Sequence, residues 1–319
     1  MNAHPWLSST PQTTTSPVGF IGLGLMGSAM AANLQKHVPL AVWNRTLTAC
    51  DPLRSAGAIV APSAQAVFED AAVVFIMLSD EIAIDAVLMT VDPDSIRGRI
   101  VVLMSTVAPS FSEEFGHRVR EAGGNYVEAP VSGSRQPAID GTLVSMLAGD
   151  DSALDDVEPL IRTMCTTAFR CGTVPSALTM KLAVNTFLIT LVTGLAEAFH
   201  FAETNDLDPD LLRSILDVGP MASAVSRAKS AKITAEDWTP HAAIPDVLKN
   251  SRLVQGHAQR TGNAAPLMEV CTALYAEAES LGRSGDDMAA VIAALRQRTR
   301  AAKGARASPY DLNEGGHHD

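Results

Sequence analysis

A glycine-rich turn between a strand-like and a helix-like segment constrains the fold more than any other feature. The stretch VGFIGLGLMGSAMAANL, residues 18–34, has three glycines at the spacing G-x-G-x-x-G. A second strand-like run, LAVWN, follows at the distance expected for a mononucleotide-binding β-α-β unit, and this context favours a nucleotide site over a mere tight turn. The helix N-terminus of such a unit offers unpaired N–H groups to phosphates. We therefore expect cofactor contacts from Gly22, Leu23, Gly24, Leu25, Met26 and Gly27.

Short apolar runs alternate with helical patterns over residues 17 to about 172. After the first strand they read LAVWN, AVVFIML, RIVVLMS, NYVEAPV, LVSMLAG and TAFRCG. This alternation predicts an α/β fold, a Rossmann domain with a doubly wound, mainly parallel sheet, over residues 17–176. Strand signals then vanish, so residues 177–298 are expected to form a long linking helix and an all-helical domain for substrate binding and dimerisation. Residues 1–16 and 299–319 are expected to be disordered tails.

Charge and composition exclude several classes of partner. The formal net charge of −11 repels a polyphosphate backbone, so nucleic acid is not expected to bind. The four cysteines form no C-x-x-C pair and show no metal-type spacing with the eight histidines, which predicts reduced thiols, no metal and a cytoplasmic location. The first sixteen residues do not resemble a secretory signal. The most apolar window, residues 182–199, is too short and too polar for a membrane span, so we expect a buried helix and no membrane contact.

The end of the second strand indicates which dinucleotide binds. An NAD site usually has Asp or Glu here, which accepts hydrogen bonds from the ribose hydroxyls and repels a 2′-phosphate. This chain has Asn44, Arg45 and Thr46 instead. The forked guanidinium of Arg45 suits a phosphate, and Thr46 adds a hydroxyl donor. We predict a preference for NADPH; the alternative is that Arg45 is a solvated surface residue.

Two later segments offer substrate contacts. Thr106 follows the strand-like run RIVVLMS, where Rossmann sheets present ligands at their carboxyl ends. Residues 132–134, here called the serine loop, offer hydroxyl and N–H donors that suit a carboxylate, although an ordinary turn has the same composition. We assign Ser132, Gly133, Ser134 and Thr106 to the substrate, and Leu78, Ser79 and Thr106 to the cofactor.

Lys181 and Asn185 stand four residues apart on an apolar helix and therefore project from one face. An ammonium among Leu, Met and Val side chains is costly to bury, so Lys181 either reaches the surface or serves a site. In carbonyl reduction, hydride arrives at carbon while negative charge builds on oxygen. A positioned ammonium stabilises that charge and donates the proton, and the neutral amine is the base for the reverse reaction. Asn185 is placed to hold the lysine or the substrate.

Four motifs in order over residues 17–298 resemble the β-hydroxyacid dehydrogenase family, which includes the 3-hydroxyisobutyrate dehydrogenases. They are GFIGLGLMGSAMAANL, EAPVSGSRQPAIDGTL, GTVPSALTMKLAVN and VLKNSRL. The stretches VWNRT, APVSGS and LDVGPMAS are most similar to the glyoxylate/succinic semialdehyde reductase branch. The resemblance implies a Rossmann domain, a long helix and a helical domain, with the active site in the cleft. It also implies that Lys181 is the catalytic acid/base, that Asn185 is its companion and that Lys249 lies near the nicotinamide.

Two positions depart from that branch. The chain reads Lys249-Asn250 where the branch has Lys-Asp, which removes a carboxylate near the catalytic lysine, although Asn250 remains a candidate substrate contact. Ala242 stands where the branch has an aromatic ring that contacts substrate, which indicates a wider pocket.

These features together predict an NADPH-dependent reductase that converts a small aldehyde, semialdehyde or 2-oxo acid to the hydroxy compound. One alternative is an imine reductase of the same architecture, although those enzymes generally carry Asp or Tyr at the lysine position and lack APVSGS. Another is a non-catalytic NADP(H)-binding module, as in chromatin-associated relatives.

Two partners are expected. The predicted reaction requires a small-molecule carbonyl substrate. Apolar helices in the second half exceed what one small helical domain covers, so we also expect a second copy of the chain in a homodimer.

Overall fold

The computed structural model describes residues 16–306, which fall into two compact units, one ending at Lys181 and the other beginning at Leu182. The first unit holds the sheet and the second is helical, so the predicted fold class is confirmed. The expected tail segments 1–15 and 307–319 lie outside the described residues.

A nine-stranded sheet forms the first unit. Its strands are β1 (Val18–Ile21), β2 (Leu40–Trp43), β3 (Ile59–Val60), β4 (Val73–Ile76), β5 (Ile100–Leu103), β6 (Asn125–Glu128), β7 (Val131–Ser132), β8 (Leu143–Ala148) and β9 (Cys165–Gly172). They run in the order β3-β2-β1-β4-β5-β6-β8-β7, with β9 paired to β8. Strands β1 to β6 pair in parallel, and β8 is antiparallel to β6 and β7. The order reverses between β1 and β4, which is where doubly wound sheets bind their ligands.

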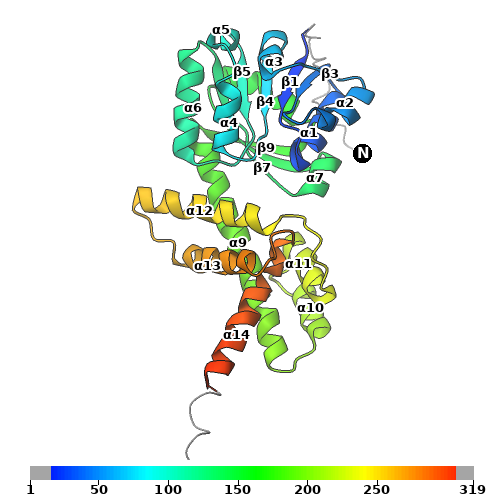
Figure 1. Cartoon of the computed structure of the whole chain (residues 1–319), viewed down its shortest axis with the longest axis vertical. Helices are drawn as coiled ribbons and strands as arrows, with labels where there is room; N and C mark the ends of the chain where they lie inside the picture. Colours follow the sequence, from blue (N-terminus) through cyan, green and yellow to red (C-terminus); the bar gives the residue numbers. More distant parts are fainter. Residues whose placement is uncertain (1–15, 307–319) are drawn as a thin grey trace, which may run out of the picture. The chain divides into compact units, whose positions relative to one another are not determined.

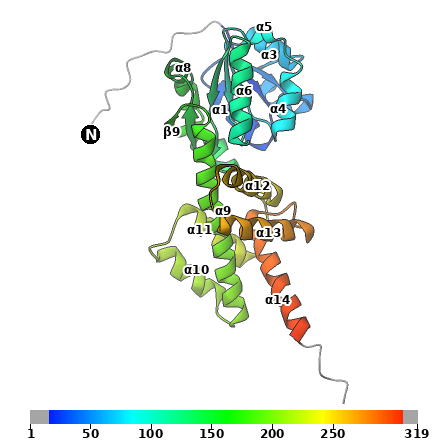
Figure 2. The ribbon, with the colours of Figure 1, turned by 90° about the vertical axis from the view of Figure 1, so that its left-hand side faces the viewer.

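Helices cover both faces of this sheet. They are α1 (Leu25–Gln35), η1 (Leu47–Cys50), α2 (Asp51–Ser55), α3 (Ala64–Asp70), α4 (Glu81–Leu88), α5 (Pro93–Ile96), α6 (Pro109–Glu121), α7 (Arg135–Asp140) and α8 (Asp151–Ile161). Successive strand residues point to opposite faces, so Phe20 packs in the core under α1 and α8, and Ile21 packs in the core under α3, α4 and α6. Figure 2 shows α8 on one side and α3, α4 and α6 on the other.

The second unit consists of helices. After α9 (Ser176–Thr204), whose first turns belong to the first unit, come α10 (Pro209–Val218), α11 (Ala224–Ala235), α12 (Ile244–Thr261), α13 (Pro266–Ser280), η2 (Met288–Val291) and α14 (Ile292–Arg306). Helices α12 and α13 lie side by side (Figure 1), and the core contains Phe199 and Tyr275.

Helix α14 continues past residue 298, so the expectation of a disordered tail from residue 299 is wrong for residues 299–306. The segment is rich in Ala and Arg, which favour helix. The ring of His200 on α9 also shares a hydrogen bond of 2.7 Å with Thr299 Oγ1, which holds this turn against the unit.

Helix α9 contains the apolar window that the sequence predicts to be a buried helix. By length and composition alone it could cross a membrane, and 44% of its most apolar window is buried inside the chain. Ile189, Val192 and Phe199 pack in the core of the second unit, whereas Phe187 is 71% exposed. The helix therefore has one core face and one exposed apolar face.

Candidate active site

Five neighbouring strands end in register at one edge of the sheet. Ile21 pairs with Trp43 and with Ile76, Ile76 pairs with Leu103, and Leu103 pairs with Glu128. The loops that leave these strands therefore start side by side. Apart from Lys181 and the serine loop, they carry the predicted residues of the first unit: residues 22–27, here called the glycine loop, then Asn44, Arg45, Thr46, Leu78, Ser79 and Thr106. The serine loop begins at the end of β7.

The glycine loop requires glycine at two of its three positions. Gly22 has φ +98°, and a Cβ there would lie 2.2 Å from the carbonyl oxygen of Met77. A Cβ on Gly27 would lie 2.1 Å from the carbonyl oxygen of Gly22. Gly24 is different, because none of the described residues comes within 4 Å of the place of its Cβ. Its freedom from packing leaves room for a ligand to approach the backbone.

The N-terminus of α1 suits a phosphate. Gly24 occupies the N-cap position, no side chain of the described residues caps the helix, and its first turn carries no acidic residue. The unpaired N–H groups of this turn and the positive end of the helix dipole favour an anion. Beside them Leu23 is buried, Met26 is half-buried and Leu25 is exposed. The donor set therefore fits the pyrophosphate of a dinucleotide.

Asn44 connects the glycine loop to the end of β2. Its Oδ1 accepts a hydrogen bond of 3.0 Å from the N–H of Leu23, and its Nδ2 donates to the carbonyl of Thr46 at 2.9 Å. Arg45 and Thr46 are exposed, and Arg45 makes no ion pair within residues 16–306. The end of β2 thus presents an available guanidinium and no carboxylate.

The loops after β4 and β5 are also tied together. Ser105 is 1% exposed, and its Oγ accepts a hydrogen bond of 2.8 Å from the N–H of Leu78. Ser79 is exposed and Thr106 half-buried. Ser105 therefore holds the two loops in place, which leaves Thr106 as the ligand candidate.

The serine loop is shaped by Gly133. That residue has φ +130°, and a Cβ on it would lie 2.6 Å from Leu143 Cδ2. Ser132 ends β7, and Ser134 takes the N-cap position of α7 without making a side-chain cap. Both hydroxyls flank a backbone turn that only glycine adopts easily.

Lys181 is buried, which excludes the alternative that it reaches the surface. Lys181 is 8% exposed, and this burial lowers the pKa of its ammonium to about 8. No carboxylate in the described part of the chain forms an ion pair with it. Asn185, one turn further along α9, is 3% exposed, and its Nδ2 is buried without a hydrogen-bond partner among the residues described. Buried donors left unpaired are costly, and a bound ligand removes that cost.

Lys249 and Asn250 lie on α12 in the second unit, so their predicted contacts with cofactor and substrate stay predictions. Both are half-buried, and Oδ1 of Asn250 is a buried acceptor with no partner among residues 16–306.

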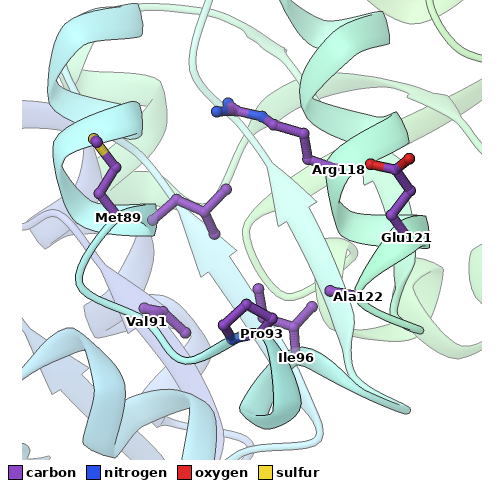
Figure 3. Close-up of a pocket in the computed structure, with 8 residues that line it drawn as sticks. Met89, Val91, Pro93, Ile96, Arg118, Glu121 and Ala122 are labelled. Atoms are coloured by element: carbon purple, nitrogen blue, oxygen red, sulfur yellow. The ribbon is translucent and has the colours of Figure 1, made fainter.

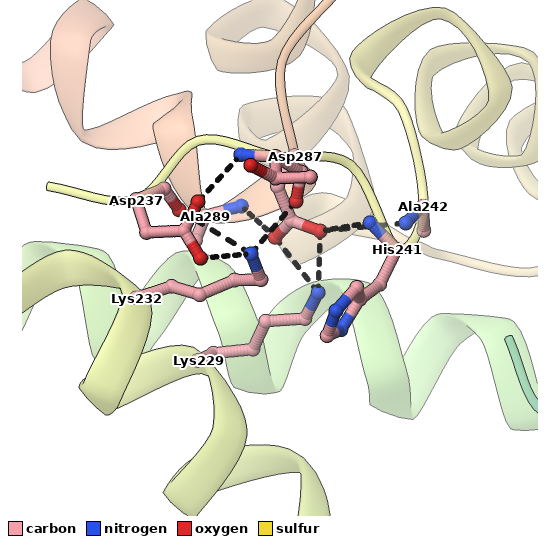
Figure 4. Close-up of polar contacts among 8 residues, drawn as sticks. Lys229, Lys232, Asp237, His241, Ala242, Asp287 and Ala289 are labelled. Atoms are coloured by element: carbon pink, nitrogen blue, oxygen red, sulfur yellow. Dashed lines mark hydrogen bonds and ion pairs between the residues drawn. The ribbon is translucent and has the colours of Figure 1, made fainter. Parts of the chain in front are cut away.

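An aspartate that the sequence analysis missed organises the start of α12. Asp287 is fully buried, and Lys229 Nζ donates to its two carboxylate oxygens at 2.7 and 2.8 Å (Figure 4). Its Oδ2 also accepts from the N–H groups of His241 and Ala242 at 2.8 and 3.4 Å, and its Oδ1 accepts from Ala289 N–H. Burial alone would raise the pKa of Asp287, but the charge and hydrogen bonds of Lys229 outweigh it and hold the pKa below its ordinary value. The carboxylate therefore fixes the segment that contains Ala242.

A second missed acid is Glu128 at the end of β6, which is fully buried. Burial raises the pKa of its carboxyl, and hydrogen bonds from Ser112, Leu178 and Ala177 oppose the rise. The available signal was a carboxylate inside the otherwise apolar run NYVEAPV.

One depression in the first unit lies away from these residues. It has a volume of about 390 Å³ and is lined by Leu88, Met89, Val91, Pro93, Ile96, Arg118, Glu121 and Ala122 (Figure 3). These residues stand at the C-terminal ends of α4 and α6 and around α5, just before β5 and β6 begin. They occupy the amino edge of the sheet, opposite the glycine loop, and take no part in the candidate site.

Within residues 16–306 no group of three or more His, Cys, Asp or Glu side chains is placed to hold a metal ion.

Comparisons with known proteins cover both units. A family model described as the NAD binding domain of 6-phosphogluconate dehydrogenase matches residues 17–172. A second, described as the NAD-binding domain of NADP-dependent 3-hydroxyisobutyrate dehydrogenase, matches residues 176–295. The chain is 32% identical over 285 residues to glyoxylate/succinic semialdehyde reductase 1 of Arabidopsis thaliana, covering 88% of this chain and 98% of that protein.

Two other similarities extend the comparison. The human cytokine-like nuclear factor N-PAC is 31% identical over 293 residues, which cover 89% of this chain and 52% of that protein. The solved structure of 3-hydroxyisobutyrate dehydrogenase from Mycobacterium tuberculosis has a TM-score of 0.81 at 24% identity, covering 89% of this chain and all of that one. That structure shares the fold.

Proposed function

Because the chain belongs to the β-hydroxyacid dehydrogenase family and is an NADP-dependent oxidoreductase acting on CH–OH groups, we propose that it reduces a small aldehyde, semialdehyde or 2-oxo acid with Lys181 as general acid. Its cofactor is NADP(H). The family membership confirms the resemblance drawn from the four motifs.

The buried ammonium of Lys181 is the observation that carries the proposal. With a pKa of about 8 it is mostly protonated at neutral pH and is still acidic enough to give up its proton. Bound NADPH supplies the hydride to the carbonyl carbon. Lys181 Nζ holds the carbonyl oxygen as charge builds there and transfers a proton to it, so that a hydroxyl forms and the neutral amine regains a proton from solvent. The free Nδ2 of Asn185 supplies a second donor to the substrate.

The serine loop and Thr106 hold the substrate's carboxylate in this proposal. Ser132, Ser134 and the backbone around Gly133 supply neutral hydrogen-bond donors. Such donors bind an anion without placing a second positive charge beside the catalytic amine. Small oxo acids and semialdehydes combine a carboxylate with a carbonyl, so they match both halves of the site.

Preference for NADPH over NADH rests on Arg45 and Thr46. Both are exposed at the end of β2, where a carboxylate would repel a 2′-phosphate. Titration of the purified protein with each reduced cofactor tests this preference, and tighter binding of NADH contradicts it.

A substrate panel tests the reaction class. Glyoxylate, succinic semialdehyde, other aldehydes and 2-oxo acids, and a cyclic imine are supplied with NADPH while its oxidation is followed. Turnover of a carbonyl acid above that of the imine supports the proposal. Faster reduction of the imine favours the alternative reductase, and binding of NADPH without turnover of any compound favours a non-catalytic module.

We also propose a homodimer and a cytoplasmic location. Phe187 and Phe201 of α9 and Leu211, Ile215 and Val218 of α10 are more than half exposed, so these helices present apolar surface that a second copy can cover. Light scattering coupled to gel filtration tests the dimer. The four cysteines are free thiols, in keeping with a reducing compartment, and microscopy of a fluorescent fusion tests the location.

A further inference from the structure

Glu128 is a buried carboxylate whose hydrogen bonds reach the helix that carries Lys181. Its Oε2 accepts from the backbone N–H groups of Ala177 and Leu178, each at 3.1 Å. These are the second and third residues of α9, which begins at Ser176. In the described residues no cation pairs with Glu128.

The other oxygen of Glu128 is held from α6. Ser112 Oγ donates to Oε1, and Ser112 Oγ is also 2.7 Å from the hydroxyl of Tyr126. Ser112 and Glu128 are fully buried and Tyr126 is 3% exposed. The carboxylate therefore has fixed partners on both sides and little freedom to move.

The contact with α9 works as an N-cap supplied from another part of the fold. The first turn of a helix has N–H groups without helical partners, and a carboxylate there satisfies them and interacts favourably with the helix dipole. Lys181 lies three residues beyond Leu178, less than one turn along the helix. Fixing the N–H groups of Ala177 and Leu178 thus fixes the height and rotation of the turn that presents Lys181.

The same residue is also close in sequence to the serine loop. Glu128 ends β6, and the chain runs from it through β7 to Ser132. One side chain thus connects the strand that leads to the substrate loop with the helix that bears the proton donor, and all of these residues belong to the first unit.

We propose that Glu128 is a positioning residue for the reaction: its carboxylate holds the first turn of α9 against the end of β6 and so sets the distance between Lys181 and the serine loop. This inference rests on the proposed function. A misplacement of about 1 Å at a reacting group can cost about 10²-fold in rate. Because a shorter side chain at position 128 would displace the first turn of α9, we expect its length to affect turnover more than its charge.

Two conservative variants separate length from charge. Glu128→Asp keeps the charge but withdraws the carboxylate by about one C–C bond, 1.5 Å. Glu128→Gln keeps the length, so that its amide oxygen still accepts from Ala177 and Leu178 while its nitrogen donates to Ser112 Oγ. Glu114→Asp, on the exposed face of α6, is the matched control.

The measurements are active-site concentration by NADPH titration, then kcat per NADPH-binding site and KM for the best carbonyl substrate. In Glu128→Asp we expect kcat to fall by about 10-fold to 10²-fold, with the NADPH dissociation constant unchanged. In Glu128→Gln we expect kcat to stay near the wild-type value, and Glu114→Asp should behave as wild type. A purely structural role would lower the number of binding sites and leave kcat per site unchanged.

Equal kcat per site in Glu128→Asp and wild type would overturn the proposal, and so would a loss in Glu128→Gln as large as that in Glu128→Asp, because the effect would then come from charge. Lys181→Ala is measured in parallel. If it retains full turnover, the proposed function fails; if it loses turnover while Glu128→Asp does not, only the positioning role fails.

Discussion

Asn44 Oδ1, at the end of β2, accepts a hydrogen bond of 3.0 Å from the backbone N–H of Leu23 in the glycine loop. The residue at the position proposed to select the cofactor therefore also supports the loop proposed to bind its phosphates. Replacement by Ala removes this acceptor and should weaken NADPH binding by about 3-fold to 10-fold, the equivalent of one hydrogen bond. Asn44→Asp keeps an acceptor but adds a charge beside Arg45, so its loss of affinity should be larger for NADPH than for NADH. Equal losses for the two cofactors would contradict a phosphate site at Arg45.

Gly24 and Gly27 should respond differently to the same substitution. In Gly27→Ala the new methyl meets the carbonyl of Gly22, so the loop must shift and both the melting temperature and NADPH binding should fall. In Gly24→Ala the methyl meets open space, so stability should change by less than about 1 kcal/mol. The methyl would nevertheless occupy the approach of the pyrophosphate and weaken NADPH binding. Thermal melts and cofactor titrations of both variants check this contrast, and unchanged affinity in Gly24→Ala would contradict a pyrophosphate at this position.

The pH dependence of turnover should report the pKa of Lys181. In the proposed mechanism reduction needs the protonated amine, so kcat for reduction should fall as the pH rises through about 8. Oxidation of the hydroxy product needs the neutral amine, so its kcat should rise over the same interval. Profiles in both directions, taken at saturating cofactor, measure the two limbs. Limbs that move in the same direction with pH would contradict one group acting as acid and base.

Lys181 should also lower the stability of the protein. Burial lowers its pKa from 10.5 to about 8, so the folded state disfavours the charge that the unfolded state accepts. The penalty is fully present below pH 8 and disappears as the pH rises to the unfolded value, and its size is about 3 kcal/mol. Lys181→Met should therefore lose activity yet unfold at higher denaturant concentration than wild type at neutral pH. A variant less stable than wild type would show that the ammonium has a stabilising partner.

The buried ion pair of Asp287 and Lys229 should be essential for the stability of the second unit. Removing one partner leaves an uncompensated buried charge, which costs about 3–5 kcal/mol, so Lys229→Met should unfold at much lower denaturant concentration. Because the pKa of Asp287 is lowered in the folded state, its contribution should be present above the unfolded pKa and be lost as the pH falls through the folded value. Asp246→Asn, at an exposed position of α12, is the control and should change stability by about 1 kcal/mol or less. Equal effects of the two substitutions would contradict the role of the pair.

The sheet could be predicted from sequence because parallel strands covered on both faces are continuous apolar runs. The segments Val18–Ile21 and Ile100–Leu103 show this pattern and are fully buried. Strand β3 was missed, because its two residues form no such run and its place is set by pairing with Ala41 and Val42 of β2.

Some residues of the candidate site could likewise be predicted from the sequence, and others could not. Gly22 and Gly27 were predictable, since their spacing directly encodes a local backbone turn. Glu128 and Asp287 were not, because Glu128 bonds to Ala177 across 49 residues and Asp287 bonds to Lys229 across 58. Only the fold brings these partners together. The sequence also left open whether Lys181 is buried, which depends on how its surroundings pack.

Single-turnover oxidation of NADPH by Lys181→Ala, with the best carbonyl substrate of the panel, tests the central claim most directly. We predict that the variant binds NADPH as wild type does and that its rate falls by about 10²-fold to 10⁴-fold, the loss typical of a general acid. Oxidation of NADPH at the wild-type rate would show that another group supplies the proton.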